Sequence, residues 1–372
     1  MMLNLGKIHH YSEAMDRRDF FGPENLGRSA SQVLAAMQAL DDPPLPDSQS
    51  GCSFLRFSHQ AMATDWEFIV PFGTPGAMDA ADVVFDRIDR LEEQLTVYRT
   101  HSEVSQLNQT AWQRPVAVDP ELFDLLALAS RLNQETEGAF DITAGALIKA
   151  WGFFRGPRRV PEQSERAQAL SRVGMKHARL DAEAKTVRFL REGLEINLGA
   201  IGKGYALDRA VADLRARGNV SSALLHGGHS SVYAIGSEPG TERGWLVALG
   251  HPLEPGRSLG TLRLRNLAMG TSAATFQYLE HRGRKLGHIL DPRIGWPATG
   301  VLSATVVANS AAQADALATA FFILGPKKAD AYCRSHEDVG VILVVDGASR
   351  PNVLGRLGGV FRAAEESVPL PG

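Results

Sequence analysis

The chain of 372 residues lacks several features that mark specialised classes of protein. Its two cysteines, Cys52 and Cys333, are too few for a disulfide framework and do not have the spacing of a zinc site. It has no uninterrupted apolar run of about 18 residues, so we expect no membrane span. Neither charge predominates, because 39 Lys+Arg against 42 Asp+Glu leave a net charge of −3. Nucleic-acid-binding proteins carry a basic excess, so we expect no nucleic-acid partner.

The N-terminal stretch differs in composition from the rest of the chain. Residues 41–50 are polar and rich in proline, which is typical of a linker. Arg17-Arg18 and the three residues after them match the core of a twin-arginine export signal, but the apolar segment that such a signal needs does not follow. We therefore favour a cytoplasmic location over export to the periplasm. We expect an N-terminal extension over 1–50, a main domain over 51–364 and a loose tail over 365–372.

Helical and strand patterns are mixed through the main domain. Val84, Ile88, Leu91 and Leu95 follow one another at intervals of four, three and four residues, which predicts an amphipathic helix over 78–95. Similar patterns predict helices over 120–135, 204–217 and 311–324, the last ended by Gly325-Pro326, and strands over 66–70, 222–226, 232–235, 245–249, 262–265, 303–308 and 339–345. Many strands follow one another through short turns. This order favours an α+β fold of mostly antiparallel sheets packed with helices, in one large domain.

The predicted helix over 311–324 carries an unusual pair of polar residues. Asp315 and Thr319 are four residues apart and so lie on one face, among alanine, leucine and phenylalanine. A carboxylate in such surroundings needs a partner or a cation, and a carboxylate with a hydroxyl suits Mg²⁺ better than zinc. The alternative is a structural role for Asp315, in a salt bridge or as a cap of a neighbouring loop.

Two further segments carry polar groups on glycine-rich or proline-rich backbone. Residues 197–206 contain three glycines and Lys203 before a predicted helix, which favours a phosphate site, although the spacing matches neither a P-loop nor a GxGxxG motif. Residues 287–297 place His288, Asp291 and Arg293 in one loop, and histidine can exchange protons near neutral pH. The alternative for residues 197–206 is a structural strand-to-helix turn. The alternative for residues 287–297 is a tight turn in which Asp291 and Arg293 satisfy backbone groups.

Taken together and in order, these segments resemble the FAD:protein FMN transferases, the ApbE-type flavin transferases. The matching stretches are Met62-Ala63-Thr64, Val97-Tyr98, residues 102–108, residues 138–143, Trp151-Gly152-Phe153, residues 197–208, Gly227-Gly228, Thr271-Ser272, residues 288–297 and residues 314–320. Each motif is modest, but their common order is specific. The resemblance spans about residues 53–345.

The resemblance implies a Mg²⁺-dependent enzyme that cleaves FAD, transfers FMN to a Ser/Thr hydroxyl of an acceptor protein and releases AMP. It implies a metal held by the Ala200 carbonyl, Asp315 and Thr319. His288, Asp315 and Lys203 are the implied catalytic residues, with His288 assisting proton transfer. The implied flavin or adenine contacts are Met62, Tyr98, Ala139, Phe140, Asp141, Asn197, Lys203 and Leu290.

The chain departs from the family pattern at a few of these positions. Asn197 stands where the family commonly has Asp, and an amide carries no charge. Ala63 replaces a usual glycine, and His229 follows Gly227-Gly228 where a small amide or acid is more usual. Two other functions fit the same residues: an FAD pyrophosphatase that gives FMN and AMP, and a flavin-binding protein without turnover.

Overall fold

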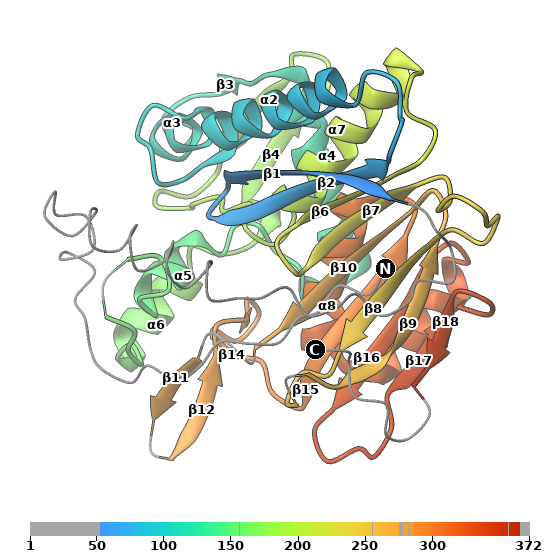
Figure 1. Ribbon diagram of the computed structural model, residues 1–372. Coiled ribbons are helices and arrows are strands. Elements are labelled where there is room, and N and C mark those ends of the chain that lie inside the picture. The colour runs from blue at the N-terminus through green and yellow to red at the C-terminus, as the bar shows by residue number, and fades with distance from the viewer. Residues whose placement is uncertain are drawn as a thin grey trace, which may run out of the picture.

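The computed structural model describes residues 53–364 apart from 156, 255, 275–277, 282 and 356. The predicted N-terminal extension, the Arg17-Arg18 pair, Cys52 and the C-terminal tail lie outside the described residues. An antiparallel sheet of eight strands organises the described chain (Figure 1). Its order is β1 (Phe54–Ala61), β2 (Thr64–Pro71), β6 (Ala223–Gly227), β7 (Ser231–Ile235), β10 (Leu267–Ala273), β15 (Val301–Ala308), β16 (Gly340–Val345) and β17 (Asn352–Gly355).

The large sheet is covered on both faces. On one face pack α2 (Ala77–Leu95), α4 (Pro120–Glu135), α7 (Gly202–Arg217) and α8 (Ala311–Ser335). On the other lies a small sheet of β18 (Phe361–Ala363), β9 (Ser258–Leu264) and β8 (Trp245–Gly250), in that order. Alternate residues of β7 enter the two cores, with Tyr233 on the helical side and Val232 on the other. This double burial explains why the central strands are apolar without a polar face.

Smaller elements complete the described chain. They are α3 (Glu103–Thr110), α5 (Gly145–Ala150), α6 (Gln163–Leu170), the 3-10 turn η2 (Met175–His177), a sheet of β3 (Val116–Ala117), β5 (Thr186–Phe189) and β4 (Ala178–Asp181), and the pairs β11 (Tyr278–His281) with β12 (Arg284–Gly287) and β13 (Leu290–Asp291) with β14 (Trp296–Pro297). In Figure 1, α5, α6 and the β11–β12 hairpin extend away from the large sheet. A separate apolar cluster with Leu147, Trp151 and Leu290 at its centre holds this region together.

The α+β class and the mostly antiparallel sheets are confirmed, and each predicted helix and strand is present. Most boundaries agree with the prediction to within two residues, as at the start of α7, which is Gly202 rather than residue 204. The exceptions are β9, which spans Ser258–Leu264 rather than 262–265, and the end of α8. At Gly325 the backbone kinks (φ 74°), but the chain resumes helical geometry after it and α8 continues to Ser335, so the predicted end marks a kink. In the described part of the chain, no helix combines the length and apolarity needed to cross a membrane.

Candidate functional site

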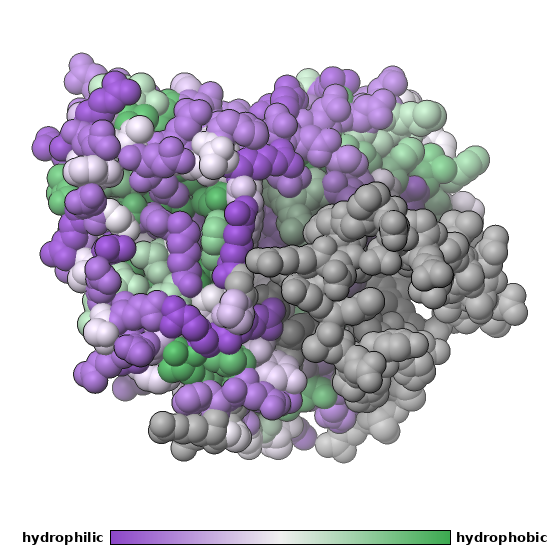
Figure 2. Space-filling view, turned by 90° about the vertical axis from the view of Figure 1, so that its left-hand side faces the viewer, coloured by the Kyte–Doolittle hydropathy of each residue, from purple (hydrophilic) through white to green (hydrophobic). Residues whose placement is uncertain are grey.

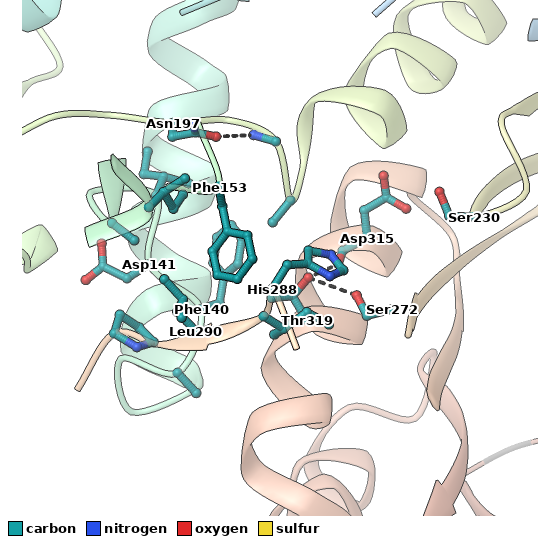
Figure 3. A pocket seen from close by; sticks show the side chains of 18 of the residues that line it. Phe140, Asp141, Phe153, Asn197, Ser230, Ser272, His288, Leu290, Asp315 and Thr319 are labelled. Carbon is teal, nitrogen blue, oxygen red and sulfur yellow. Dashed lines mark hydrogen bonds between the residues drawn. The ribbon is translucent and has the colours of Figure 1, made fainter. Parts of the chain in front are cut away.

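A cleft of about 440 Å³ opens between α7 and α8 on one side and the loops around α5 and β13 on the other (Figure 3). Its volume lies in the range of roughly 300–1,000 Å³ that is usual for small-molecule sites. We call two groups of its lining residues the helix wall and the loop wall. The helix wall comprises Ala200, Lys203, Ser272, Asp315 and Thr319, and the loop wall comprises Tyr98, Ala139, Phe140, Asp141, Phe153, His288 and Leu290.

The helix wall depends on unusually close approach of backbones around α8. The first turns of α8 are alanine-rich and buried, which lets neighbouring elements come close. A Cβ on Gly204 of α7 would lie 2.1 Å from the Ala311 carbonyl oxygen, and a Cβ on Gly270 of β10 would lie 2.6 Å from the Asp315 backbone nitrogen. Glycine is therefore required on both sides of the turn that presents Asp315.

Asp315 is buried and held by two donors, and within the described part of the chain it forms no salt bridge. Its Oδ2 accepts a hydrogen bond from the Gly204 amide at 2.8 Å, and the Ser231 hydroxyl lies 2.8 and 2.9 Å from its two carboxylate oxygens. Burial raises the pKa of Asp315 to about 6, and the positive charge of Lys203 acts in the opposite direction. A buried carboxylate with no salt bridge and facing a cleft is a suitable ligand for a cation.

Thr319 stands one turn further along α8 and completes the polar face. Its hydroxyl lies 3.0 Å from the Ser272 hydroxyl and 3.4 Å from the carbonyl oxygen of Asp315 (Figure 3). With Ala200, these residues bring carboxylate, hydroxyl and carbonyl oxygens to one wall. Among the described residues no group of three His, Cys, Asp or Glu could hold a metal ion. The donors available here are hard oxygens, which fit Mg²⁺ and do not fit zinc.

A second contact ties α7 to the start of α8. The Asp208 carboxylate accepts hydrogen bonds from the Ala311 amide at 2.8 Å, the Ala312 amide at 3.0 Å and the Ser310 hydroxyl at 2.7 Å. It thereby satisfies backbone donors that the first turn of a helix leaves unpaired. Asp208 follows Gly204 by one turn, so a single face of α7 holds α8 at two successive points.

The loop wall is built from side chains that fold loops back on themselves. Asp141 accepts hydrogen bonds from the amide and hydroxyl of Thr143, at 2.8 and 2.6 Å, and from the Met175 amide at 3.2 Å. Burial raises the pKa of Asp141 above its ordinary value, although these donors favour its ionised form. The carbonyl of Phe140 accepts a hydrogen bond from the Asn133 side chain at 2.8 Å. The turn is thus fixed with its aromatic ring at the cleft.

The outer part of the loop wall is aromatic. Tyr98 is 53% exposed and stacks on Phe154, with ring centroids 4.7 Å apart and planes within 4° of parallel. Arg155 lies over both rings and donates a hydrogen bond to the Tyr98 carbonyl at 3.0 Å. Phe153 meets the His288 ring edge to face. This end of the cleft therefore offers flat, partly exposed surfaces to a planar ligand.

The cleft brings together the predicted residues Tyr98, Ala139, Phe140, Asp141, Asn197, Ala200, Lys203, His288, Leu290, Asp315 and Thr319. Met62 is not among its lining residues; it lies in the turn between β1 and β2 and packs against the main core. The Asn197 side-chain oxygen accepts a hydrogen bond from the Gly199 amide at 2.9 Å, so this contact lies within its own loop. Because the Gly204 amide binds Asp315, it is not available to a phosphate.

The structure also bears on the alternatives that the sequence left open. Asp315 accepts a hydrogen bond from the Gly204 amide, as the structural alternative predicts, and at the same time it lines the cleft. Asp291 and Arg293 pair with each other at 2.7 Å, and Asp291 accepts the Arg293 amide at 2.9 Å, so these two charges stabilise the turn. His229 is an exposed turn residue.

Sequence reasoning missed the partners that orient the site. Ser231 begins a strand and has no feature that separates it from other serines, yet it binds Asp315. Gly270 stands in a strand pattern, where an isolated glycine signals close approach of another backbone, and this signal could have been used. Asp208 belongs to the stretch 197–208 that resembles the family, but it caps α8, and this role depends on a tertiary contact that the sequence does not show.

Comparison with known proteins agrees with this architecture. The model of the ApbE family matches residues 62–343. An FAD:protein FMN transferase of Klebsiella pneumoniae is 32% identical over 71% of this chain and 81% of its own, and one of Treponema pallidum is 31% identical over 71% and 76%. The crystal structure of the ApbE protein of Thermotoga maritima superposes with a TM-score of 0.75, at 28% identity, over 83% of this chain and all of that one. The chain belongs to the ApbE family.

Proposed function

We propose that this protein transfers FMN from FAD to a serine or threonine hydroxyl of an acceptor protein and releases AMP, with Mg²⁺ as cofactor. One observation carries the proposal. In a member of the ApbE family, a buried acid and hydroxyl pair, Asp315 and Thr319, shares one cleft with Lys203, the exposed aromatic ring of Tyr98 and the imidazole of His288. These are the parts that cleavage of a dinucleotide at its diphosphate requires.

Asp315, Thr319 and the Ala200 carbonyl would hold the cation. When bound, Mg²⁺ would neutralise charge on the diphosphate. Lys203 supplies a further positive charge in the same cleft, and this charge lowers the pKa of Asp315 against the larger effect of burial. The exposed ring of Tyr98 and the partly exposed ring of Phe153 offer surfaces against which the flat parts of FAD can pack, whereas the ring of Phe140 is buried in the main core.

The reaction needs one proton transfer and one phosphoryl displacement. The acceptor hydroxyl oxygen attacks the phosphorus of the FMN half, and the bond from that phosphorus to the bridging oxygen breaks. AMP leaves with the bridging oxygen, and the hydroxyl proton passes to an imidazole nitrogen of His288. The exposed outer loop wall leaves room for a segment of a second protein to reach this point.

The test is incubation of the full chain with FAD, MgCl₂ and a threonine-bearing acceptor peptide. We expect fluorescent peptide with the added mass of FMN, release of AMP, and loss of both with EDTA. FMN and AMP without labelled peptide would assign the site to FAD hydrolysis instead. Intact bound FAD would indicate a flavin-binding protein.

A further inference from the structure

We propose that the acceptor segment is acidic and docks on a basic rim formed by Arg155, Arg158 and Lys285 at the outer edge of the loop wall. This inference rests on the proposed function, since it names the chemistry of the second substrate. The rim joins Arg155 and Arg158, which follow α5 in the chain, to the β11–β12 hairpin, whose last residue precedes His288. It therefore borders the place where an acceptor hydroxyl must arrive.

The hairpin presents one face to the protein and one to solvent. Leu279 and Leu286 are directly opposite each other and pack against the apolar cluster that contains Phe153. Because side chains alternate along a strand, Tyr278 and Lys285 belong to the other face. Lys285 lies over the Tyr278 ring, 4.4 Å from its centroid, and is exposed.

A direct contact makes the rim continuous. The Arg158 guanidinium donates a hydrogen bond to the Tyr278 carbonyl at 3.3 Å, and Arg155 donates to the carbonyl of Tyr98 at 3.0 Å. Both arginines are exposed. The rim thus runs from the ring of Tyr98, which lines the cleft, to the hairpin that leads to His288.

The charges of the rim are available to a partner. Within the described residues, no carboxylate lies within 4.0 Å of a charged nitrogen of Arg155, Arg158 or Lys285, whereas neighbouring Arg159 is paired with Glu165 and Lys149 with Glu195. In the hairpin, Glu280 is opposite Lys285. Figure 2, which views the molecule from this side, shows hydrophilic residues interspersed with hydrophobic patches on the described surface. Three exposed cations without a carboxylate within salt-bridge distance among the described residues, on a chain with a net charge of −3, favour an acidic partner.

The experiment measures peptide binding separately from turnover. The probes are a fluorescent peptide with one threonine flanked by aspartates and the same peptide with lysines in place of the aspartates. With FAD-loaded protein, we expect anisotropy to show at least about tenfold tighter binding of the acidic peptide, weakened by salt. The double variant Arg158→Glu/Lys285→Glu should lose this binding, with its KM for FAD within about twofold of the parent value.

A matched control separates the rim from net charge. Arg90→Glu/Lys327→Glu changes the charge by the same amount on exposed positions of α2 and α8, and should bind the acidic peptide like the parent protein. Equal binding of both peptides, unchanged binding by the rim variant, or equal loss in the control would overturn the proposal. A raised KM for FAD with unchanged peptide binding would assign the rim to the dinucleotide and also overturn it. Absence of flavin transfer to every acceptor would contradict the proposed function, which the binding result does not test.

Discussion

The two walls of the cleft are built in different ways. The helix wall lies on regular elements whose backbones touch, with glycine at Gly204 and Gly270 and a buried carboxylate at Asp315. The loop wall lies on turns that are held by side-chain hydrogen bonds and ends in the exposed ring of Tyr98. The contrast indicates that the groups proposed to act on the diphosphate are placed rigidly, and that the surfaces proposed to recognise the rings and the acceptor can adapt.

Replacement of Asp315 by asparagine should give the largest effect. The substitution removes the charge of the predicted metal ligand and retains its shape, so we expect transfer to fall by about three orders of magnitude or more, because a bound cation contributes several kcal/mol. Its melting temperature should be equal to or above that of the parent protein, since a costly buried charge is lost. Transfer kinetics and the shift in melting temperature on addition of MgCl₂ measure the two effects.

Asp213→Asn is the matched control for this prediction. Asp213 is on α7 and pairs with Arg87 of α2 at 2.7 Å, away from the cleft. We expect this variant to be slightly less stable and to keep both transfer and the thermal response to MgCl₂. Retained activity in Asp315→Asn would show that the cation site has been placed wrongly.

The close packing of the helix wall can be broken by one methyl group. In Gly204→Ala the new Cβ would lie 2.1 Å from the Ala311 carbonyl oxygen. Because the atoms that it meets belong to the backbone of α8 and cannot rotate away, α7 and α8 must separate. We expect a loss of about 1–3 kcal/mol of stability, or more, with reduced transfer. Gly202→Ala, where the nearest atom is 3.9 Å away, should leave the free energy of unfolding equal or higher. Equal stability of the two variants in urea unfolding would contradict the account of the helix wall.

Asp208 offers a smaller and more graded change. Asp208→Ala removes the acceptor of two α8 amides and should lower the free energy of unfolding by about 1–2 kcal/mol, whereas Asp208→Asn should lose less because it retains one acceptor. If the cap also positions Asp315, Asp208→Ala should need more MgCl₂ for half-maximal thermal stabilisation. If Asp208→Asn needs no more MgCl₂ than the parent protein, the higher requirement of Asp208→Ala comes from lost positioning of Asp315 and not from general destabilisation.

The difference in stability between the parent protein and Asp208→Asn should depend on pH. Burial raises the pKa of Asp208 above its ordinary value of 3.8, so the folded protein binds this proton more tightly than the unfolded chain. The resulting stabilisation is fully present below pH 3.8 and is lost as pH rises through the folded pKa. The parent protein should therefore lose stability relative to Asp208→Asn as pH increases over that window. A constant difference between the two unfolding curves would contradict the burial of the charge.

The helix wall could be predicted from sequence further than the loop wall, for physical reasons. The spacing of Asp315 and Thr319 within a helix of small residues carries information on burial, face and chemistry at once. The glycines around Lys203 signalled close backbone approach, and the structure shows what approaches: α8. The loop wall depends on contacts between segments distant in sequence, such as Thr143 with Gly174, which periodicity does not encode.

Partners of buried groups were the least predictable part of the site. Nothing in the sequence around Ser231 links it to a carboxylate 84 positions later, because that contact depends on how β7 and α8 pack. The long α8 shows the opposite case: Gly325-Pro326 correctly indicated a break in the helix, but burial of Tyr332 and Cys333 favours helical continuation beyond it. Local signals thus fixed the position of the kink, and tertiary packing decided what followed.

The smallest predicted effect is at the exposed end of the loop wall. Phe154→Ala removes the ring that stacks on Tyr98 at 4.7 Å, so Tyr98 should become less ordered while the catalytic groups stay in place. An aromatic pair contributes about 0.5–1.5 kcal/mol, which corresponds to a rise of about two- to twelvefold in KM for FAD with kcat little changed. Phe72→Ala, at a ring that is 72% exposed and outside the cleft, is the control and should leave KM unaltered. A fall in kcat with unchanged KM in Phe154→Ala would show instead that the aromatic end of the loop wall, and not His288 alone, contributes to the chemical step, and the contrast between the two walls would no longer hold.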